Sequence, residues 1–291
     1  MQLPYSTSQW ICSERCAFER GFPGKRRACS EGIWEVLTQI LMLSITVTMT
    51  VTKYPTEVQP HSAAGRVLLF GASRGLGLAL AEKWVEGGWH VTATVRETGK
   101  TALHELAERH RLQVEIESLD VTSPFQIAAM RDRLAGKKFD LLFHNAGTAN
   151  QPDGTVAETA TDEFIKVMVT NALSPLRVIE AFQDCVEPTG TIGVMSSGQG
   201  SVANNTNGGH EVYRGSKAAL NSYMRSYDAR HRGEKRTLIL MAPGWVKTDL
   251  GGPDARLTIE ESIPGVIKVI DSLHGQPGLH YVDYLGQTVP W

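Results

Sequence analysis

Cysteine and net charge are both scarce in this 291-residue sequence. Three of the four cysteines precede residue 30, and neither their spacing nor the histidines complete a zinc site. The rest of the chain holds only Cys185, which favours a reducing compartment and predicts a cytoplasmic protein. The formal net charge is −2, so no global basic field points to nucleic acid. The composition therefore indicates neither a metal site nor a nucleic-acid partner.

The first 64 residues differ in character from the rest. Residues 33–52 are apolar with only Glu35 charged, and residues 53–65 form a polar, proline-containing linker. The apolar segment has about the 20 residues that a spanning helix needs, but Thr and Ser interrupt it. A signal peptide would begin nearer the amino terminus. We expect residues 1–64 to be a disordered or dispensable extension. A start at Met49, or less readily at Met42, would remove nearly all of the apolar segment. A membrane or targeting role and a packed extra element stay open.

From Gly65 onward, short apolar runs alternate with segments of helical length. The predicted strands are residues 66–70, 90–95, 113–117, 139–143, 190–195 and 236–241. The predicted helices are residues 76–87, 101–111, 124–135, 161–184 and 211–231. This alternation predicts a single α/β domain over 65–291, a Rossmann-like, doubly wound parallel sheet flanked by helices. Ligands of such sheets bind at the carboxyl ends of the strands.

A glycine-rich turn joins the first predicted strand to the first helix, with the spacing GxxxGxG. Glycine lets the backbone approach a pyrophosphate, and the helix amino terminus presents free N–H groups to the anion. A plain strand-to-helix turn is the alternative, but the order strand, glycines, helix favours a nucleotide. The residues expected to contact a cofactor here are Gly71, Ser73, Arg74, Gly75, Leu76 and Gly77.

The end of the second strand indicates which nucleotide binds. An acid at this position would hydrogen-bond a ribose 2′-OH, but the sequence has Val95 and Arg96 there. Arg74 lies within the glycine turn. Each arginine alone is as well explained as a solvated charge, yet the two together suit a 2′-phosphate. The sequence therefore favours NADP(H).

Two further strand ends fit the same pocket. Asp120 and Val121 follow the third strand and are candidates for adenine contacts, although Asp120 also suits a helix cap. The run of residues 145–147 follows the fourth strand, where small residues let the chain pass close to a ribose; an ordinary turn is the alternative. Its members are Asn145, Ala146 and Gly147.

Candidate chemical groups follow in the second half of the chain. Tyr213 and Lys217 are four residues apart in a predicted helix, so the cation can lower the phenol pKa and provide an acid–base group. Ser196 and Ser197 follow the fifth strand at the same sheet edge. Asn171 lies inside a predicted helix, where an amide is unfavourable without partners. Each residue alone is as readily an ordinary surface or core side chain.

In order and spacing, these motifs resemble the short-chain dehydrogenase/reductase family over residues 65–291. The resemblance implies that Tyr213 is the general acid/base, that Lys217 lowers its pKa and holds the nicotinamide ribose, and that Ser197 binds the carbonyl. Asn171 would support a proton relay. The segment after the sixth strand would flank the nicotinamide through Pro243, Gly244, Val246 and Thr248. Two neighbours depart from the family pattern: Phe70 replaces a usual Thr, and His144 a frequent Asn.

The carboxyl end narrows the resemblance. The segment from Thr248 to a helix-capping pattern at Thr258–Glu261 is short, which leaves little room for a substrate lid. This feature and the ending at residues 286–291 resemble the carbonyl-reductase branch that includes the C-factor and sniffer proteins. That branch implies an open pocket and a broad range of carbonyl substrates.

Three functions remain on the sequence alone. The first is an NADPH-dependent reductase of small aldehydes or ketones. The second is a nucleotide-binding regulatory or signalling protein with little turnover, which the intact Ser–Tyr–Lys set disfavours. The third is a membrane-anchored reductase that uses residues 33–52. Both a monomer and a homodimer through the helices 161–184 and 211–231 remain open.

Overall fold

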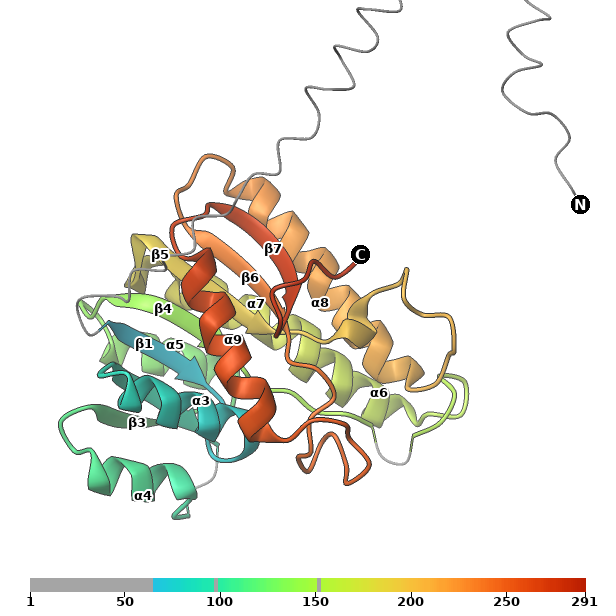
Figure 1. Cartoon of the computed structure of the whole chain (residues 1–291), viewed down its shortest axis with the longest axis horizontal. Helices are drawn as coiled ribbons and strands as arrows, with labels where there is room; N and C mark the ends of the chain where they lie inside the picture. Colours follow the sequence, from blue (N-terminus) through green and yellow to red (C-terminus); the bar gives the residue numbers. More distant parts are fainter. Residues whose placement is uncertain (1–64, 97–98, 151–152) are drawn as a thin grey trace, which may run out of the picture. The chain divides into compact units, whose positions relative to one another are not determined.

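The protein was analysed as a computed structural model that describes residues 65–96, 99–150 and 153–291. The predicted extension 1–64, with its apolar segment 33–52, lies outside these described residues. Seven parallel strands form one sheet in the order β3-β2-β1-β4-β5-β6-β7, with helices on both faces (Figure 1). This confirms the predicted single α/β domain of Rossmann type. Among the described helices, none combines the length and the apolar character needed to cross a bilayer.

The strands follow the apolar runs closely. Their bounds are β1 Arg66–Phe70, β2 His90–Val95, β3 Val114–Ser118, β4 Phe139–His144, β5 Val186–Met195, β6 Thr237–Ala242 and β7 Gly278–Asp283. The first β-strand pairs with β2 on one side and β4 on the other, so the strand order reverses direction between β1 and β4. In such sheets the ligand crevice opens at this switch point.

The sequence analysis missed β7. Its residues GLHYVD lack the continuous apolar run of central strands such as β1 and β6, and only Tyr281 and Val282 are buried. As the last strand at one edge of the sheet, β7 pairs with β6 alone. An edge strand needs less apolar character, because part of its surface faces solvent. The outer edge of β7 is bonded by the tail, since Asp283 N donates to the Gln287 carbonyl and Val289 N to the Tyr281 carbonyl.

The helices connect the strands and cover the sheet. Their bounds are α3 Gly75–Glu86, α4 Ala102–Arg109, α5 Pro124–Arg133, α6 Thr161–Met168, α7 Ser174–Phe182, α8 Glu211–Arg230 and α9 Ile259–Leu273. The predicted capping box of α9 is present, since Thr258 and Glu261 bond each other's backbone N–H groups. A box of this kind satisfies two N–H groups that otherwise lack partners.

The long helix predicted over 161–184 is divided. A π-helical turn, η2 Val169–Leu173, separates α6 from α7, and a 3₁₀ turn, η3 Gln183–Cys185, follows. Pro175 in the first turn of α7 has no N–H to bond the carbonyl four residues earlier, so the regular ladder is interrupted there. Widened π turns of this kind are frequent at functional sites. Asn171 lies in this turn.

Two hydrophobic cores lie on the two faces of the sheet. Successive residues of β1 alternate between them: Leu68 and Phe70 pack under α5, α7 and α8, whereas Val67 and Leu69 pack under α3, α4 and α9. Figure 1 shows α3 and α9 in front of the sheet. Burial on both faces explains why the central strands are continuously apolar.

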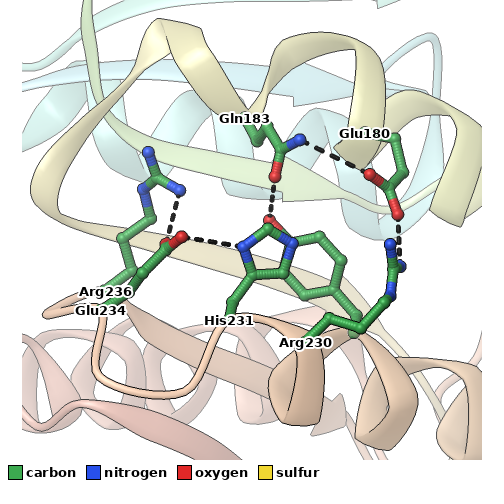
Figure 2. A network of polar contacts seen from close by, with 7 residues as sticks. Glu180, Gln183, Arg230, His231, Glu234 and Arg236 are labelled. Atoms are coloured by element: carbon green, nitrogen blue, oxygen red, sulfur yellow. Dashed lines mark hydrogen bonds and ion pairs between the residues drawn. The ribbon is translucent and has the colours of Figure 1, made fainter.

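A polar network at the carboxyl end of α8 ties this helix to α7 (Figure 2). Arg230 pairs with Glu180, and the Tyr227 hydroxyl donates to Gln183 Oε1 at 2.7 Å. Beyond the helix, Glu234 bridges His231 and Arg236, with both contacts 2.8 Å long. The network fixes α8 at the end remote from Tyr213, so the helix can present its first turns rigidly to the strand ends.

Candidate active site

A cleft of about 1310 Å³ opens at the carboxyl ends of the strands. It brings together residues from nearly every strand–helix connection, as the parallel topology requires. The sequence-predicted residues that line it are Gly71, Ser73, Arg74, Gly75, Leu76, Arg96, Asp120, Val121, Asn145, Ala146, Gly147, Ser197, Tyr213, Lys217, Pro243, Gly244, Val246 and Thr248. Two predicted residues, Gly77 and Asn171, lie outside its lining and contact it through neighbours.

The glycine turn is built by close backbone approach. Gly71 and Gly75 have φ of 84° and 58°, which side chains rarely adopt. A Cβ on Gly77 would lie 2.0 Å from the Gly71 carbonyl oxygen, so this position packs the turn instead of facing the cleft. The Asn145 side chain donates to the same carbonyl at 2.8 Å, and Thr94 Oγ1 accepts from Gly71 N at 2.9 Å. The turn is therefore held from both neighbouring strands.

The amino terminus of α3 faces this cleft without a side-chain cap. Arg74 is its N-cap residue, and no side-chain oxygen accepts from the first turn. The helix therefore keeps N–H groups and a positive dipole end for an anion. A Cβ on Gly75 would lie 3.8 Å from Thr248 Cγ2, so the segment after β6 packs against the glycine turn. These features fit a dinucleotide pyrophosphate.

Charges at the second strand end also fit the predicted cofactor. Arg96 follows β2 directly and lines the cleft, and neither Val95 nor Arg96, the described residues at this strand end, is acidic. Arg74 Nε lies 3.2 Å from Asp249 Oδ2, with both side chains mostly exposed. An exposed pair of this kind is weak, so it leaves the guanidinium able to bind a phosphate.

The structure at the end of β3 decides whether Asp120 is a helix cap or a cleft residue. The cap of α5 is Ser123, whose Oγ accepts from Gln126 N at 3.3 Å. Asp120 instead accepts from the backbone N and hydroxyl of Thr122 at 2.9 and 2.8 Å, while it lines the cleft. Asp120 is thus a loop residue at the cleft wall and not the helix cap.

Tyr213, Lys217 and Ser197 converge in the cleft. Tyr213 and Lys217 are neighbours on α8, with Lys217 Nζ 5.8 Å from the centre of the phenol ring. Lys217 is buried and donates to the Met195 carbonyl at 2.9 Å. Ser197 lines the same cleft, beside the Tyr213 phenol. The three groups therefore form one polar cluster that can bind an oxygen and deliver a proton to it.

Burial controls the acidity of this cluster. It raises the pKa of Tyr213 to about 12, although the neighbouring Ser197 side chain acts in the opposite direction. It lowers the pKa of Lys217 to about 8. The sequence predicted that Lys217 brings the phenol pKa down toward neutrality, and this was wrong for the structure described. Desolvation of the phenolate is the larger effect, so Tyr213 stays protonated at neutral pH.

The two serines after β5 have different surroundings. Ser197 faces Tyr213, whereas Ser196 is 2% exposed and donates to Asn221 Oδ1 at 2.7 Å. From the sequence alone, Ser197 was preferred to Ser196 only because of its position in the family motif. Both serines line the cleft, and the geometry favours Ser197 because the Ser196 hydroxyl already donates its proton to Asn221.

Asn171 acts from behind the cleft wall. Its Oδ1 accepts from Thr148 N at 2.8 Å, and its Nδ2 donates to the Thr148 carbonyl at 2.7 Å and to Ser216 Oγ at 2.9 Å. All of its hydrogen-bonding groups thus have partners, as a fully buried amide requires. Thr148 lines the cleft, so Asn171 shapes the site through the loop after β4.

The two departures from the family pattern are neighbours in space. Phe70 and His144 pair across β1 and β4, and their rings stack 6.0 Å apart. Burial, with a smaller contribution from the Lys217 charge, lowers the pKa of His144 to about 3. The imidazole is therefore neutral and packs as a core ring beneath the turn at residues 145–147.

Some cleft residues escaped the sequence analysis. They are Thr148, Ala149, Gln199, Asn204, His210, Trp245, Leu250 and Val289. Trp245 is half-exposed, and its indole N–H donates to the Gly251 carbonyl at 2.7 Å. Its place between two predicted contacts, Gly244 and Val246, was an available signal. No local pattern marked Val289 as a cleft residue, because only the tertiary fold brings the carboxyl-terminal tail to the cleft.

Comparisons with known proteins agree with this geometry. The family profile described as Enoyl-(Acyl carrier protein) reductase matches residues 71–262. The C-signal of Myxococcus xanthus is 38% identical over 154 residues, which are 52% of this chain and 92% of that protein. A structure from Burkholderia multivorans with bound NADP is described as a short-chain dehydrogenase/reductase. It is 53% identical to this chain, the match covers 79% of this chain and 100% of that chain, and the TM-score is 0.77.

A carbonyl reductase from Pseudomonas aeruginosa PAO1 in complex with NADP is also similar. It is 33% identical, with 79% of this chain and 100% of that chain covered and a TM-score of 0.73. The chain belongs to the short-chain dehydrogenase/reductase family, as the sequence motifs predicted, and is an oxidoreductase of this family. The resemblance to C-factor and carbonyl reductases is confirmed by these matches.

Proposed function

We propose that the protein is an NADPH-dependent carbonyl reductase that converts a small aldehyde or ketone to an alcohol. The observation that carries the proposal is the cluster of Ser197, Tyr213 and Lys217 in the same cleft as the uncapped amino terminus of α3. The similarity to NADP-bound carbonyl reductase supports it. Arg96 and Arg74 support the phosphorylated cofactor, since both line the cleft where a 2′-phosphate is recognised.

The cofactor would be held by the glycine turn, the two arginines, Asp120 and Val121, residues 145–147, and the segment 243–248. When bound, NADPH supplies the hydride that reduces the carbonyl carbon. The protein supplies position and a proton. Ser197 holds the carbonyl oxygen by its hydroxyl, and Tyr213 gives its phenolic proton to that oxygen. Lys217 binds the nicotinamide ribose and places a positive charge beside the phenolate that remains.

Absorbance at 340 nm tests this proposal. The full chain is mixed with NADPH or NADH and a panel of aldehydes, ketones and quinones. We expect oxidation of NADPH that depends on the carbonyl and is faster than with NADH. NADPH binding without turnover on a broad panel would contradict the reductase proposal.

A second function is supported by one comparison. The M. xanthus relative is named C-signal, and 154 residues, 52% of this chain, match it. A nucleotide-binding regulatory protein would keep the glycine turn without needing turnover. The two functions separate in one experiment, because a regulator binds NADPH with unchanged affinity in a Tyr213→Phe variant and shows no carbonyl-dependent oxidation even in the wild type.

The roles of residues 1–64 and the cellular location form a linked proposal. We propose a cytoplasmic enzyme whose catalytic domain is residues 65–291 and whose extension is dispensable. The chain from 65 onward holds a single, buried cysteine, which suits a reducing compartment. A protein that starts at Met49 is expected to match the full chain in activity and to fractionate with the cytosol. Recovery of only the full chain with membranes would contradict this.

A further inference from the structure

Ser197 is held by three buried polar side chains, and the predicted site includes none of them. We call Ser196, Asn221 and Tyr281 the brace. They come from three separate places, the end of β5, the middle of α8 and the edge strand β7. Each is only 2–3% exposed. Three buried polar side chains at one place need a structural or functional explanation, because burying each of them costs desolvation free energy.

The brace bonds the turn that carries Ser197. The Tyr281 hydroxyl donates to the Ser197 carbonyl at 2.6 Å. Asn221 accepts from the Ser196 hydroxyl at 2.7 Å and donates through Nδ2 to the Gly200 carbonyl at 3.2 Å. Burial raises the pKa of the Tyr281 phenol, and the neighbouring Asn221 and Ser196 side chains act in the opposite direction. The 3₁₀ turn η4, Gly198–Gly200, is thus bonded at both of its ends.

The turn also rests directly on the helix of the Tyr213–Lys217 pair. A Cβ on Gly200 would lie 2.8 Å from Asn221 Nδ2 and 3.0 Å from the Lys217 backbone. Asn221 is four residues beyond Lys217 and eight beyond Tyr213, so all three lie along one stripe of α8. The brace therefore fixes Ser197 relative to the helix face that carries Tyr213.

The carboxyl-terminal tail covers the brace. The Trp291 ring lies 5.3 Å from the Tyr281 ring, and the Trp291 carbonyl accepts from Ala203 N at 2.9 Å. Val289 N donates to the Tyr281 carbonyl at 2.8 Å. These contacts leave the Tyr281 phenol one orientation, toward Ser197.

We propose that the brace is a positioning device for the reaction: Asn221, Ser196 and Tyr281 hold the 197–200 turn so that the Ser197 hydroxyl meets Tyr213. The proposal rests on the proposed reductase function, in which Ser197 and Tyr213 act on the same carbonyl oxygen. Loss of the Tyr281 hydroxyl lets the serine shift without removing a cleft-lining group, because Tyr281 is not part of the cleft lining. Small displacements of positioning groups reduce turnover more than binding.

A matched pair of tyrosine variants tests the proposal. Tyr281→Phe removes one buried phenol hydrogen bond at the site. Tyr227→Phe removes an equally buried phenol hydrogen bond, the one that Gln183 accepts in Figure 2, at the far end of α8. We expect Tyr281→Phe to lower kcat about tenfold or more, with KM changed less than about threefold and the NADPH Kd unchanged. We expect Tyr227→Phe to keep kcat within about twofold, at a similar loss of Tm.

Equal kcat in the wild type and Tyr281→Phe would overturn the proposal, as would equal losses in both tyrosine variants. Ser196→Ala is a second, smaller change that frees Asn221 and is expected to lower kcat in the same direction. If the wild type reduces no carbonyl compound, the proposed reductase function is wrong. Crystal structures of the variants then test whether the brace positions Ser197. Ser197 Oγ is then expected to leave Tyr213 in Tyr281→Phe but not in Tyr227→Phe, and an unmoved Ser197 would contradict the brace.

Discussion

The side-chain amide of Asn171 pairs with the backbone of Thr148 in both directions, as one strand residue pairs with another. Its Oδ1 accepts from Thr148 N at 2.8 Å, and its Nδ2 donates to the Thr148 carbonyl at 2.7 Å. The π turn at 169–173 makes this pairing possible by directing a helical residue toward the loop after β4. Thr148 in turn lines the cleft. An element of irregular helix thus holds the loop that forms one wall of the site.

Asn171→Ala is expected to destabilise the protein and disturb the loop. It leaves both backbone groups of Thr148 without their partner, at a cost of about 1–3 kcal/mol per buried group. Urea unfolding measures the loss, and Asn205→Ala, at an exposed position, is the control. We expect at least about 2 kcal/mol for Asn171→Ala and under 0.5 kcal/mol for the control. Equal stability of the two variants would show that the pairing contributes nothing.

Tyr213→Phe is expected to remove turnover and to keep cofactor binding. The pKa of Tyr213 is raised to about 12, so the phenol is protonated and can donate at every pH from 6 to about 10. Without it, kcat should fall by about 10³-fold, while the NADPH Kd stays within about threefold. Tyr223→Phe, on the same helix and half-exposed, controls for the substitution. Full activity of Tyr213→Phe would assign the proton to another group.

Lys217 gives the folding stability a defined pH dependence. Its pKa falls from 10.5 to about 8 in the folded protein because of burial. Between these values the unfolded chain binds more protons than the folded one, so stability rises as pH rises. From pH 7 to 9.5 the wild type should gain about 2 kcal/mol relative to Lys217→Met.

Urea unfolding of both proteins at the two pH values measures this difference. Lys247→Met, at an exposed position, is the control and should follow the wild type. Parallel pH dependences for the wild type and Lys217→Met would show that the lysine is not desolvated as described. The same loss of charge above about pH 8 is expected to weaken NADPH binding in the wild type, since Lys217 lies beside the nicotinamide ribose in the proposed function.

Arg96→Asp is expected to reverse the cofactor preference. An acid at the end of β2 would accept from a ribose 2′-OH and repel a 2′-phosphate. The ratio of kcat/KM for NADPH to that for NADH should fall by at least about 100-fold, because a favourable ion contact becomes a repulsive one. Arg111→Asp makes the same change of charge at an exposed position outside the cleft lining. An unchanged ratio in Arg96→Asp would place the 2′-phosphate elsewhere.

Local signals in the sequence predicted the sheet core and most cofactor-facing residues. The central strands, such as β1, β4 and β6, appear as apolar runs because burial on both faces demands continuous apolar side chains. The glycine turn was readable because the residue type is forced by a positive φ at Gly71 and by the 2.0 Å approach at Gly77. The helix of Tyr213 and Lys217 was readable because a spacing of four residues places two side chains on one face.

Tertiary contacts alone decided the rest. Strand β7 has no strong pattern of its own, so Tyr281 could not be placed behind Ser197 from the sequence. The lysine was expected to dominate the pKa of Tyr213, but the outcome depends on burial by segments far apart in the chain. A charge neighbour along a helix is a local property, whereas desolvation, edge pairing and the distance between Ser197 and Tyr213 are set by how the whole chain closes around the site.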